Sequence, residues 1–331
     1  MKEWFSLSES DRKEAIIQTS IDKGLPAAAI EKDWWVVTVL RTIFATKYAE
    51  HLVFKGGTSL SKAWGLIERF SEDIDLAMDR SFFGFGGTLN RTKVSNLRKA
   101  SCKFASEVFP DELSKTLKAQ EVKDFSIHIG AFEDSDTDPI AIEIRYDSLV
   151  ERIEYLEPRI LVEISSRSLR DPFENRDIVS FIGEKYKGQP FADKPIKVPT
   201  VLPTRTFLEK LFLLHEEFQK PKTRPILSKR MTRHLYDISK LMDTEFEEAA
   251  LKDKKLYSDI VEHRSILTRI SKMDYSTHAQ KTLDFIPPDR VMKEWENDYK
   301  DMDESMFYGK TEPFEELINK LRDLRGRINK I

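Results

Sequence analysis

Two carboxylates and a pair of glycines stand at a spacing that could support metal-assisted chemistry on phosphates. The segment Phe54-Lys-Gly-Gly-Thr-Ser-Leu-Ser-Lys is followed by Ser71-Glu-Asp-Ile-Asp-Leu. Side chains of a strand alternate between its faces, so Asp73 and Asp75 point the same way while their apolar neighbours face a core. Two carboxylates one pleat apart repel each other unless a cation lies between them, and such oxygen ligands suit Mg²⁺ shared with substrate phosphates. The pattern therefore predicts a metal and nucleotide site.

The glycines are expected to form a turn that leads into a helix over residues 59–67. Backbone amides at a helix N-terminus bind phosphate, and a hydroxyl and a lysine on the same helix would add to that binding. Asp-x-Asp also occurs on exposed strands, and Gly-Gly by itself marks only a tight turn. The combination at this spacing favours the functional interpretation. The predicted phosphate-binding residues are Gly56, Gly57, Thr58, Ser59 and Lys62.

These motifs resemble a known superfamily. Gly56-Gly-Thr-Ser-Leu-Ser-Lys with Ser71-Glu-Asp-Ile-Asp-Leu is similar to motif I of the DNA polymerase β-like nucleotidyltransferases, and more closely to the AbiEii family of nucleotidyltransferase toxins. Softer matches are Glu31-Lys-Asp-Trp-Trp-Val, Arg233-His-Leu-Tyr-Asp-Ile and a last helix that begins near Pro313, so the resemblance covers nearly all of the chain. It implies an α+β fold in which a polymerase β-like nucleotidyltransferase core, a mixed sheet with helices, is joined to a C-terminal helical domain.

We expect three regions along the chain. Residues 1–47 form N-terminal helices packed on the core, residues 48–199 form the nucleotidyltransferase core, and residues 200–331 form the helical C-terminal domain. The N-terminal helices break at Gly24-Leu-Pro. Trp34 and Trp35 lie in an apolar stretch and are expected in the core rather than at a ligand. The charged residues just before them, Glu31, Lys32 and Asp33, are expected to be surface or capping residues.

The core region offers two candidates for a third carboxylate. Strands are predicted at 126–132, 140–146 and 160–165, after a loop at 82–88 and a helix over 93–108. Glu143 and Glu163 each stand opposite three β-branched or apolar residues, and periodicity does not choose between them. A third carboxylate could bind a second metal or accept the proton of the nucleophile. The family resemblance favours Glu163.

The resemblance also implies functional residues beyond the motif. From spacing alone, Lys210 is a surface lysine on an apolar helix. The AbiEii-like pattern implies instead that Lys210 reaches the nucleotide triphosphate and that Asp237, on the next helix, orients that lysine or touches the nucleotide. His234 stands where the family often has an acid. Ser71 joins the predicted nucleotide-binding residues, and a phosphate added to it would place negative charge where the triphosphate must lie.

Composition sets limits on compartment and partners. The chain of 331 residues has a formal net charge of -3, so a nucleic acid must be met by a local basic patch. One such segment contains Lys220, Lys222, Arg224, Lys229, Arg230 and Arg233, although such a run is more commonly a solvated surface. The single cysteine, Cys102, cannot form an internal disulfide, and neither a signal peptide nor a membrane span is apparent. We therefore expect a cytoplasmic protein.

These observations predict an Mg²⁺-dependent nucleotidyltransferase. It would move a nucleotidyl group from a nucleoside triphosphate to an acceptor and release pyrophosphate, with Asp73, Asp75 and Glu163 as metal ligands. The resemblance implies an RNA acceptor such as tRNA, and a toxin of a toxin–antitoxin or phage-defence system with a separately encoded antitoxin. Two alternatives stay open: a nucleotidyltransferase that modifies a protein or small molecule, and a catalytically silent nucleotide- or RNA-binding module.

Overall fold

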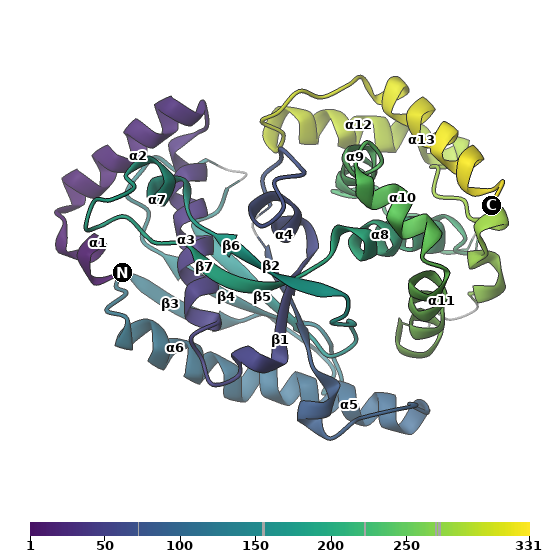
Figure 1. The fold of residues 1–331 in the computed structure, drawn as a ribbon, viewed down its shortest axis with the longest axis horizontal. Coiled ribbons are helices and arrows are strands. Elements are labelled where there is room, and N and C mark those ends of the chain that lie inside the picture. The colour runs from purple at the N-terminus through teal and green to yellow at the C-terminus, as the bar shows by residue number, and fades with distance from the viewer. Residues whose placement is uncertain (72, 154–155, 222, 269, 271–272) are drawn as a thin grey trace. The chain divides into compact units, whose positions relative to one another are not determined.

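The chain divides into two compact units. The computed structural model describes residues 1–331 except 72, 154–155, 222, 269 and 271–272 (Figure 1). The first unit comprises Met1–Trp64 and Phe70–Val201, and the second comprises Gly65–Arg69 and Leu202–Ile331. The backbone therefore enters the second unit briefly at Gly65–Arg69 before it returns to the first.

A mixed sheet organises the first unit. Within the described residues it has seven strands in the order β3-β4-β5-β2-β1-β7-β6. The pairs β2–β5 and β1–β7 are parallel, and the other neighbours are antiparallel. This mixed sheet with many helices is the predicted α+β class. The strands are β1 (Leu52–Lys55), β2 (Asp73–Met78), β3 (Phe125–Ile129), β4 (Ile140–Tyr146), β5 (Arg159–Ser165), β6 (Phe173–Ile178) and β7 (Ile196–Val201).

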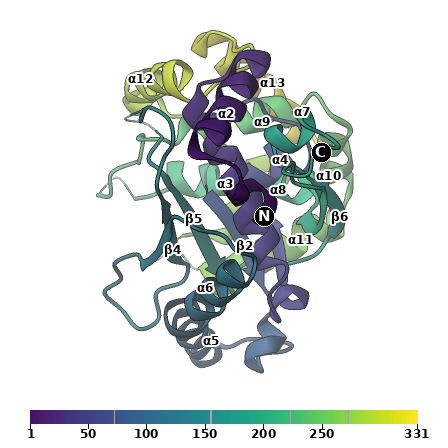
Figure 2. The same cartoon turned by 90° about the vertical axis from the view of Figure 1, so that its left-hand side faces the viewer.

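Helices cover one face of this sheet. The apolar helix α3 packs against β5 and α6, and Figure 2 shows β2, β4 and β5 together with α5 and α6 from a second direction. A π-helical segment, Phe104–Val108, joins α5 to α6 and contacts β4. The helices of the first unit are α1 (Lys2–Ser6), α2 (Glu9–Lys23), α3 (Ala27–Ile43), α4 (Gly56–Lys62), α5 (Arg91–Lys103), α6 (Phe109–Ala119) and α7 (Phe181–Lys185).

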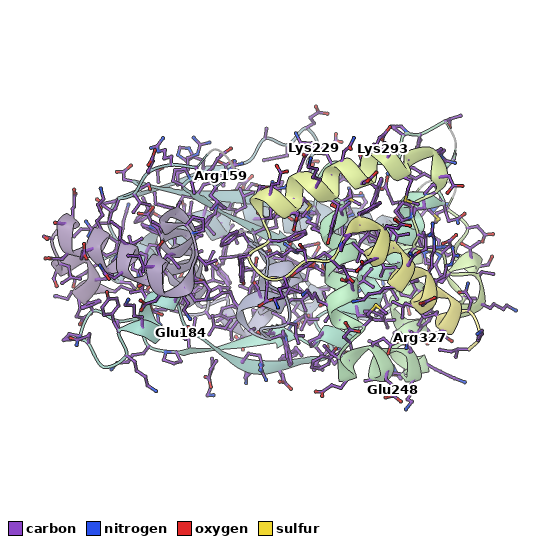
Figure 3. The ribbon with its side chains drawn as sticks, turned by 90° about the horizontal axis from the view of Figure 1, so that it is seen from above. Arg159, Glu184, Lys229, Glu248, Lys293 and Arg327 are labelled. Carbon is purple, nitrogen blue, oxygen red and sulfur yellow. The ribbon has the colours of Figure 1, made fainter. Side chains whose placement is uncertain are left out.

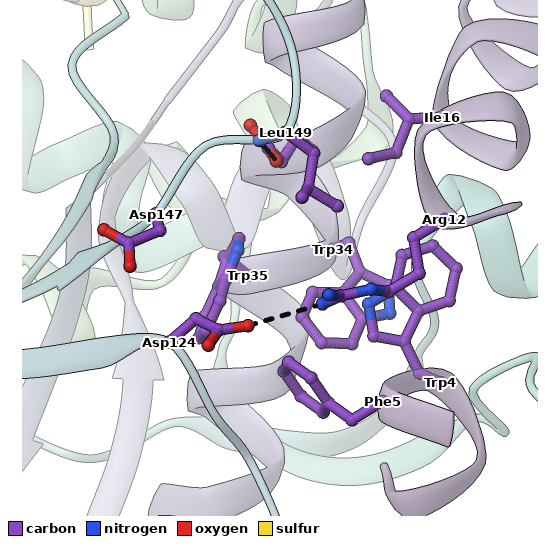
Figure 4. A pocket seen from close by; sticks show the side chains of 10 residues that line it. Trp4, Phe5, Arg12, Ile16, Trp34, Trp35, Asp124, Asp147 and Leu149 are labelled. Carbon is purple, nitrogen blue, oxygen red and sulfur yellow. Dashed lines mark hydrogen bonds and ion pairs between the residues drawn. The ribbon is translucent and has the colours of Figure 1, made fainter. Parts of the chain in front are cut away.

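The N-terminal helices show the predicted break and the predicted aromatic core. Helix α2 ends before Gly24, whose φ of +66° is the left-handed value that suits glycine. Trp34 and Trp35 are both buried, with Trp34 stacked on Trp4 at 5.0 Å between ring centroids. Figure 4 shows these rings beside the Arg12–Asp124 ion pair, around a cavity of about 10 Å³, which has room for one water molecule and not for a ligand.

The charged residues at the start of α3 do not lie on the surface, so that expectation was wrong. Glu31, Lys32 and Asp33 are all buried. Each finds an internal partner. Glu31 accepts hydrogen bonds from the Ser148 hydroxyl and the Leu149 amide, Lys32 donates to the Glu157 carbonyl, and Asp33 accepts from the Phe181 amide. Burial of a charged group is tolerated when it is paired in this way, and helical periodicity does not reveal such partners.

The second unit is helical, as expected for the C-terminal region. The apolar stripe of α8, from Phe207 to Leu214, is buried. Among the described residues, no helix of either unit is long and apolar enough to cross a membrane. The helices are α8 (Pro203–Phe218), α9 (Thr232–Leu241), α10 (Glu245–Lys252), α11 (Lys254–His263), α12 (Asp289–Ser305) and α13 (Phe314–Ile328).

Candidate functional site

A close approach between Gly56 and Asp75 forms the centre of the candidate site in the first unit. Helix α4 follows β1 directly, and Gly56 at the junction has a φ of +81°. A Cβ atom built on Gly56 would lie 2.0 Å from Oδ2 of Asp75. A side chain at this position would therefore both strain the backbone and displace the carboxylate. The glycine of the motif lets Asp75 lie against the start of α4.

The strand register places the predicted carboxylates on one face of the sheet. Asp75 of β2 lies opposite Glu163 in the parallel strand β5, and Asp73 precedes Asp75 by one pleat. Ile74 and Leu76, which alternate with the aspartates, are fully buried on the other face. We call Asp73, Asp75 and Glu163 the carboxylate row. Its three members are half-buried, so they keep access to solvent.

Glu143, the alternative third carboxylate, has other partners. It lies opposite Leu161 rather than beside an aspartate, and its carboxylate accepts hydrogen bonds from Arg145 and Arg159. Although partial burial opposes the shift, these two arginines hold the pKa of Glu143 below its ordinary value. The register thus favours Glu163 as the neighbour of the aspartates, while Glu143 belongs to an arginine network on β4 and β5.

The hydroxyls of the motif close the turn rather than pointing to solvent. Thr58 and Ser59 are fully buried. The Ser59 hydroxyl donates to the Gly56 carbonyl at 2.8 Å, and Thr58 Oγ1 donates to the Asp73 carbonyl and lies 2.8 Å from Ser71 Oγ. The donors that remain at the start of α4 are its first backbone amides, including that of Gly57, because these have no partner within the helix.

Helix α4 is shorter than predicted, and its lysine is engaged elsewhere. The helix ends at Lys62 instead of residue 67, because Gly65 has a φ of +64° and the chain leaves for the second unit there. Lys62 Nζ lies 2.6 Å from Asp33 Oδ1 and over the ring of Phe181. Burial raises the pKa of Asp33 even so, since the desolvation outweighs this ion pair. Lys62 therefore serves the packing of α4 on α3.

The second unit contains a buried cluster of charged residues around Asp237. Arg69 binds both carboxylate oxygens of Asp237, at 2.7 and 2.8 Å, and Lys210 Nζ lies 2.8 Å from Oδ2. Asp237 is 0% exposed and Lys210 is 7% exposed. Burial alone would raise the pKa of Asp237, but the two cations outweigh it and hold that pKa well below its ordinary value.

His234 completes this cluster. Its Nδ1 lies 3.3 Å from Lys210 Nζ, so the ammonium donates to a neutral imidazole. Burial, reinforced by the charges of Lys210 and Arg233, holds the pKa of His234 well below its ordinary value. Burial also lowers the pKa of Lys210, against the pull of Asp237. We call Arg69, Lys210, His234 and Asp237 the buried ion cluster.

The sequence motifs did not predict two residues that lie at these sites, Lys55 and Arg69. Lys55 ends β1 directly opposite Asp75, and Arg69 is the bidentate partner of Asp237. The alternation of side chains along β1, which places Phe54 inward and Lys55 outward, could have indicated Lys55. Arg69 had no such signal, because 168 residues separate it from its partner.

The basic segment, which extends into the start of α9, is partly exposed. Arg224 and Lys229, the latter labelled in Figure 3, lie at the surface, whereas Lys220 pairs with Glu217 at 2.6 Å. Lys222 lies outside the described residues. The segment keeps exposed positive charge that a polyanion could contact.

The donor set suits a hard divalent cation that is shared with a ligand. Among the residues that the structure describes, no group of three or more His, Cys, Asp or Glu side chains is arranged to hold a metal ion. Mg²⁺ commonly needs only one or two carboxylates, because phosphate oxygens and waters complete its octahedron. Asp73 and Asp75 fit that requirement, and the bare Gly56 leaves the space in which Asp75 stands.

Comparison with known proteins gives a family match over most of the chain and a similar solved structure. A family model described as "Nucleotidyl transferase AbiEii toxin, Type IV TA system" matches residues 38–320. Among solved structures, the chain is similar to MenT4, a nucleotidyltransferase toxin from Mycobacterium tuberculosis H37Rv, with a TM-score of 0.51 and 16% sequence identity over 98% of this chain and 90% of that one. At this identity the likeness shows a shared fold. No curated protein sequence gave a match.

Proposed function

The chain belongs to the AbiEii family of nucleotidyltransferase toxins of type IV toxin–antitoxin systems, and from this premise we propose that it transfers a nucleotidyl group from an Mg²⁺-bound nucleoside triphosphate to RNA, with tRNA as the first acceptor to test. The observation that carries the proposal is the motif geometry: Asp73 and Asp75 share one sheet face, and Asp75 lies against Gly56 at the start of α4. Carboxylates beside free helix amides suit a triphosphate with its metal.

Each residue then has a defined task. Asp73 and Asp75 would hold Mg²⁺, which neutralises phosphate charge when bound. The first amides of α4, with Gly57 among them, bind phosphate oxygens. The buried hydroxyls of Thr58 and Ser59, with the half-buried hydroxyl of Ser71, hold the conformation of that turn. Glu163, beside Asp75, accepts the proton of the nucleophile or completes a second metal position.

The buried ion cluster has a supporting task. An ammonium has three N–H donors, and the contacts of Lys210 with Asp237 and His234 use two of them. We assign the third donor to phosphate, as the family implies, and we assign to Asp237 the orientation of Lys210, because Arg69 and Lys210 already occupy both of its oxygens. Asp237 is thus a positioning residue.

The reaction balances without a further reactant. An acceptor hydroxyl oxygen forms a bond to the α-phosphorus, the bond from that phosphorus to the bridging oxygen breaks, and pyrophosphate leaves. The hydroxyl proton passes to Glu163 or to solvent. The exposed charges of Arg224 and Lys229 support RNA as the acceptor, and family membership supports a separately encoded antitoxin as the partner.

Labelled nucleotide transfer tests this function. Purified protein is incubated with Mg²⁺, total cellular RNA and each of four α-labelled nucleoside triphosphates. We expect label in a discrete RNA class, and a loss of at least about a hundredfold in Asp73→Asn, because a metal contributes several kcal/mol to the transition state. Asp177→Asn, which changes an exposed carboxylate on β6, is the matched control and should retain activity.

The location of the label decides between the alternatives. Label in protein or in a small molecule would replace RNA as the acceptor. Nucleotide binding without any transfer, with RNA, protein and small-molecule acceptors all offered, would contradict the catalytic proposal. Transfer that survives in Asp73→Asn would overturn the metal assignment.

A further inference from the structure

Lys55 stands at the junction between β1 and the glycine turn, next to the carboxylate row. It is the last residue of β1, and it lies directly opposite Asp75 in the antiparallel pair β1–β2. Opposed residues of such a pair share one face of the sheet, with Cβ atoms roughly 4.5–5.5 Å apart. Lys55, Asp75 and Glu163 therefore lie side by side on one face of three neighbouring strands. The sequence immediately continues into Gly56, the residue that receives Asp75.

Lys55 differs from the other lysines near the motif and in the cluster. Lys62 is paired with Asp33, and Lys210 is paired with Asp237. Among the residues that the structure describes, by contrast, neither Lys55 nor Asp75 makes an ion pair, although the register sets the two side chains against each other. Opposite charges in this position ordinarily attract and pair. Both residues are half-buried, so solvent reaches them.

A polyphosphate explains this arrangement. We propose that Lys55 binds phosphate oxygens of the nucleotide whose metal is held by Asp73 and Asp75. Lys55 thus takes the phosphate-binding role that was predicted for Lys62. An ammonium on a strand end beside the first amides of α4 acts as a point charge for phosphate. The inference rests on the proposed nucleotide site, and it adds a cation from the first unit itself. Lys55 is thereby a substrate-binding residue, while Lys62 is structural.

Binding of inorganic tripolyphosphate in the presence of Mg²⁺ tests the role without knowledge of the base. Titration calorimetry on Lys55→Met should show affinity weakened by about ten- to a hundredfold, the usual range for one charge-assisted hydrogen bond. The same factor should apply to all four nucleoside triphosphates, because the contact is with phosphate. Lys55→Arg should recover part of the affinity. Lys62→Met should unfold more easily, yet its folded form should bind tripolyphosphate as the wild type does.

The affinity for a metal ion alone shows whether Lys55 contacts phosphate or only holds the site in shape. With Mn²⁺ alone, followed by electron paramagnetic resonance, Lys55→Met should bind the ion as tightly as the wild type or more tightly, since a nearby positive charge has been removed. If Lys55→Met instead weakened Mn²⁺ and tripolyphosphate together, Lys55 would merely hold Asp75 in place and the proposal would fail. Unchanged tripolyphosphate affinity in Lys55→Met would overturn it as well.

The wild type distinguishes this proposal from the proposed function. A wild-type protein that binds tripolyphosphate and nucleotides, with Lys55→Met equal to it, removes Lys55 from the site and leaves the nucleotidyltransferase proposal intact. A wild-type protein that binds neither tripolyphosphate nor any nucleoside triphosphate removes both proposals together.

Discussion

The carboxylate row and the buried ion cluster both contain aspartates near cationic side chains, but these aspartates differ in whether they are paired. In the carboxylate row, Asp75 has a lysine opposite it in register and no ion pair within the described residues. In the buried ion cluster, both oxygens of Asp237 are bound by cations and none of its surface is exposed. At Asp75 the first arrangement leaves a carboxylate that a ligand can satisfy, whereas in the second arrangement the carboxylate of Asp237 is satisfied internally. This contrast supports the proposed roles, in which the row holds the metal and Asp237 of the cluster positions Lys210.

The largest effect that tests this contrast is on stability. Asp237→Asn leaves Arg69 and Lys210 buried without their counter-charge, and breaking a buried pair in this way costs about 3–5 kcal/mol. The matching change in the row, Asp75→Asn, removes repulsion between neighbouring carboxylates and should leave the free energy of unfolding unchanged or slightly higher. Urea unfolding of both variants measures the difference.

The opposite result would contradict the roles given to Asp237 and to the carboxylate row. If Asp237→Asn were as stable as the wild type and lost only nucleotide transfer, Asp237 would contact the nucleotide directly and would not be a positioning residue. If Asp75→Asn were the variant that unfolded, the row would be structural.

Much of the first unit could be predicted from its sequence because the signals are local. The alternation of Asp73, Ile74 and Asp75 places the aspartates on one face, and the glycine turn marks the start of a helix. The family resemblance drawn from these residues is confirmed by a family match over residues 38–320. Helix α8 and the lysine on it also lie in the predicted region.

The remainder depends on contacts between segments that are distant in sequence. Lys55 meets Asp75 only through the register of β1 and β2, and Arg69 meets Asp237 across 168 residues. Strands β6 and β7 were missed for a different reason: β6 is a largely exposed edge strand without an apolar alternation, and β7 contains Pro199. Local pattern cannot supply such pairings.

A smaller change should disturb the row without disturbing the cluster. Gly56→Ala forces a Cβ atom against Asp75 at a φ of +81°, so we expect at least a tenfold loss of transfer with a stability cost of about 1–3 kcal/mol. Gly326→Ala, where a Cβ meets open space, is the matched control. Full activity in Gly56→Ala would show that the position of Asp75 is not critical.

The smallest expected effect is the loss of stability at acid pH that His234 of the buried ion cluster causes. The folded protein keeps His234 neutral because its pKa is held well below the ordinary value of about 6.5, mainly by burial. Below that pH the unfolded chain binds a proton that the folded protein does not, so stability falls as the pH falls, by at most about 1.4 kcal/mol for each pH unit. His215, whose pKa burial also lowers, adds to the slope with the same sign.

Urea unfolding between pH 7.5 and about pH 5 therefore measures the cluster, since the ordinary pKa of histidine lies inside this window. We expect His234→Gln to show a shallower loss of stability on acidification than the wild type, while His128→Gln, at an exposed position on β3, should follow the wild type. An unchanged slope in His234→Gln would mean that His234 takes up its proton in the folded protein. Lys210 would then lack a neutral acceptor there, and the cluster would not be satisfied internally in the way that separates it from the carboxylate row.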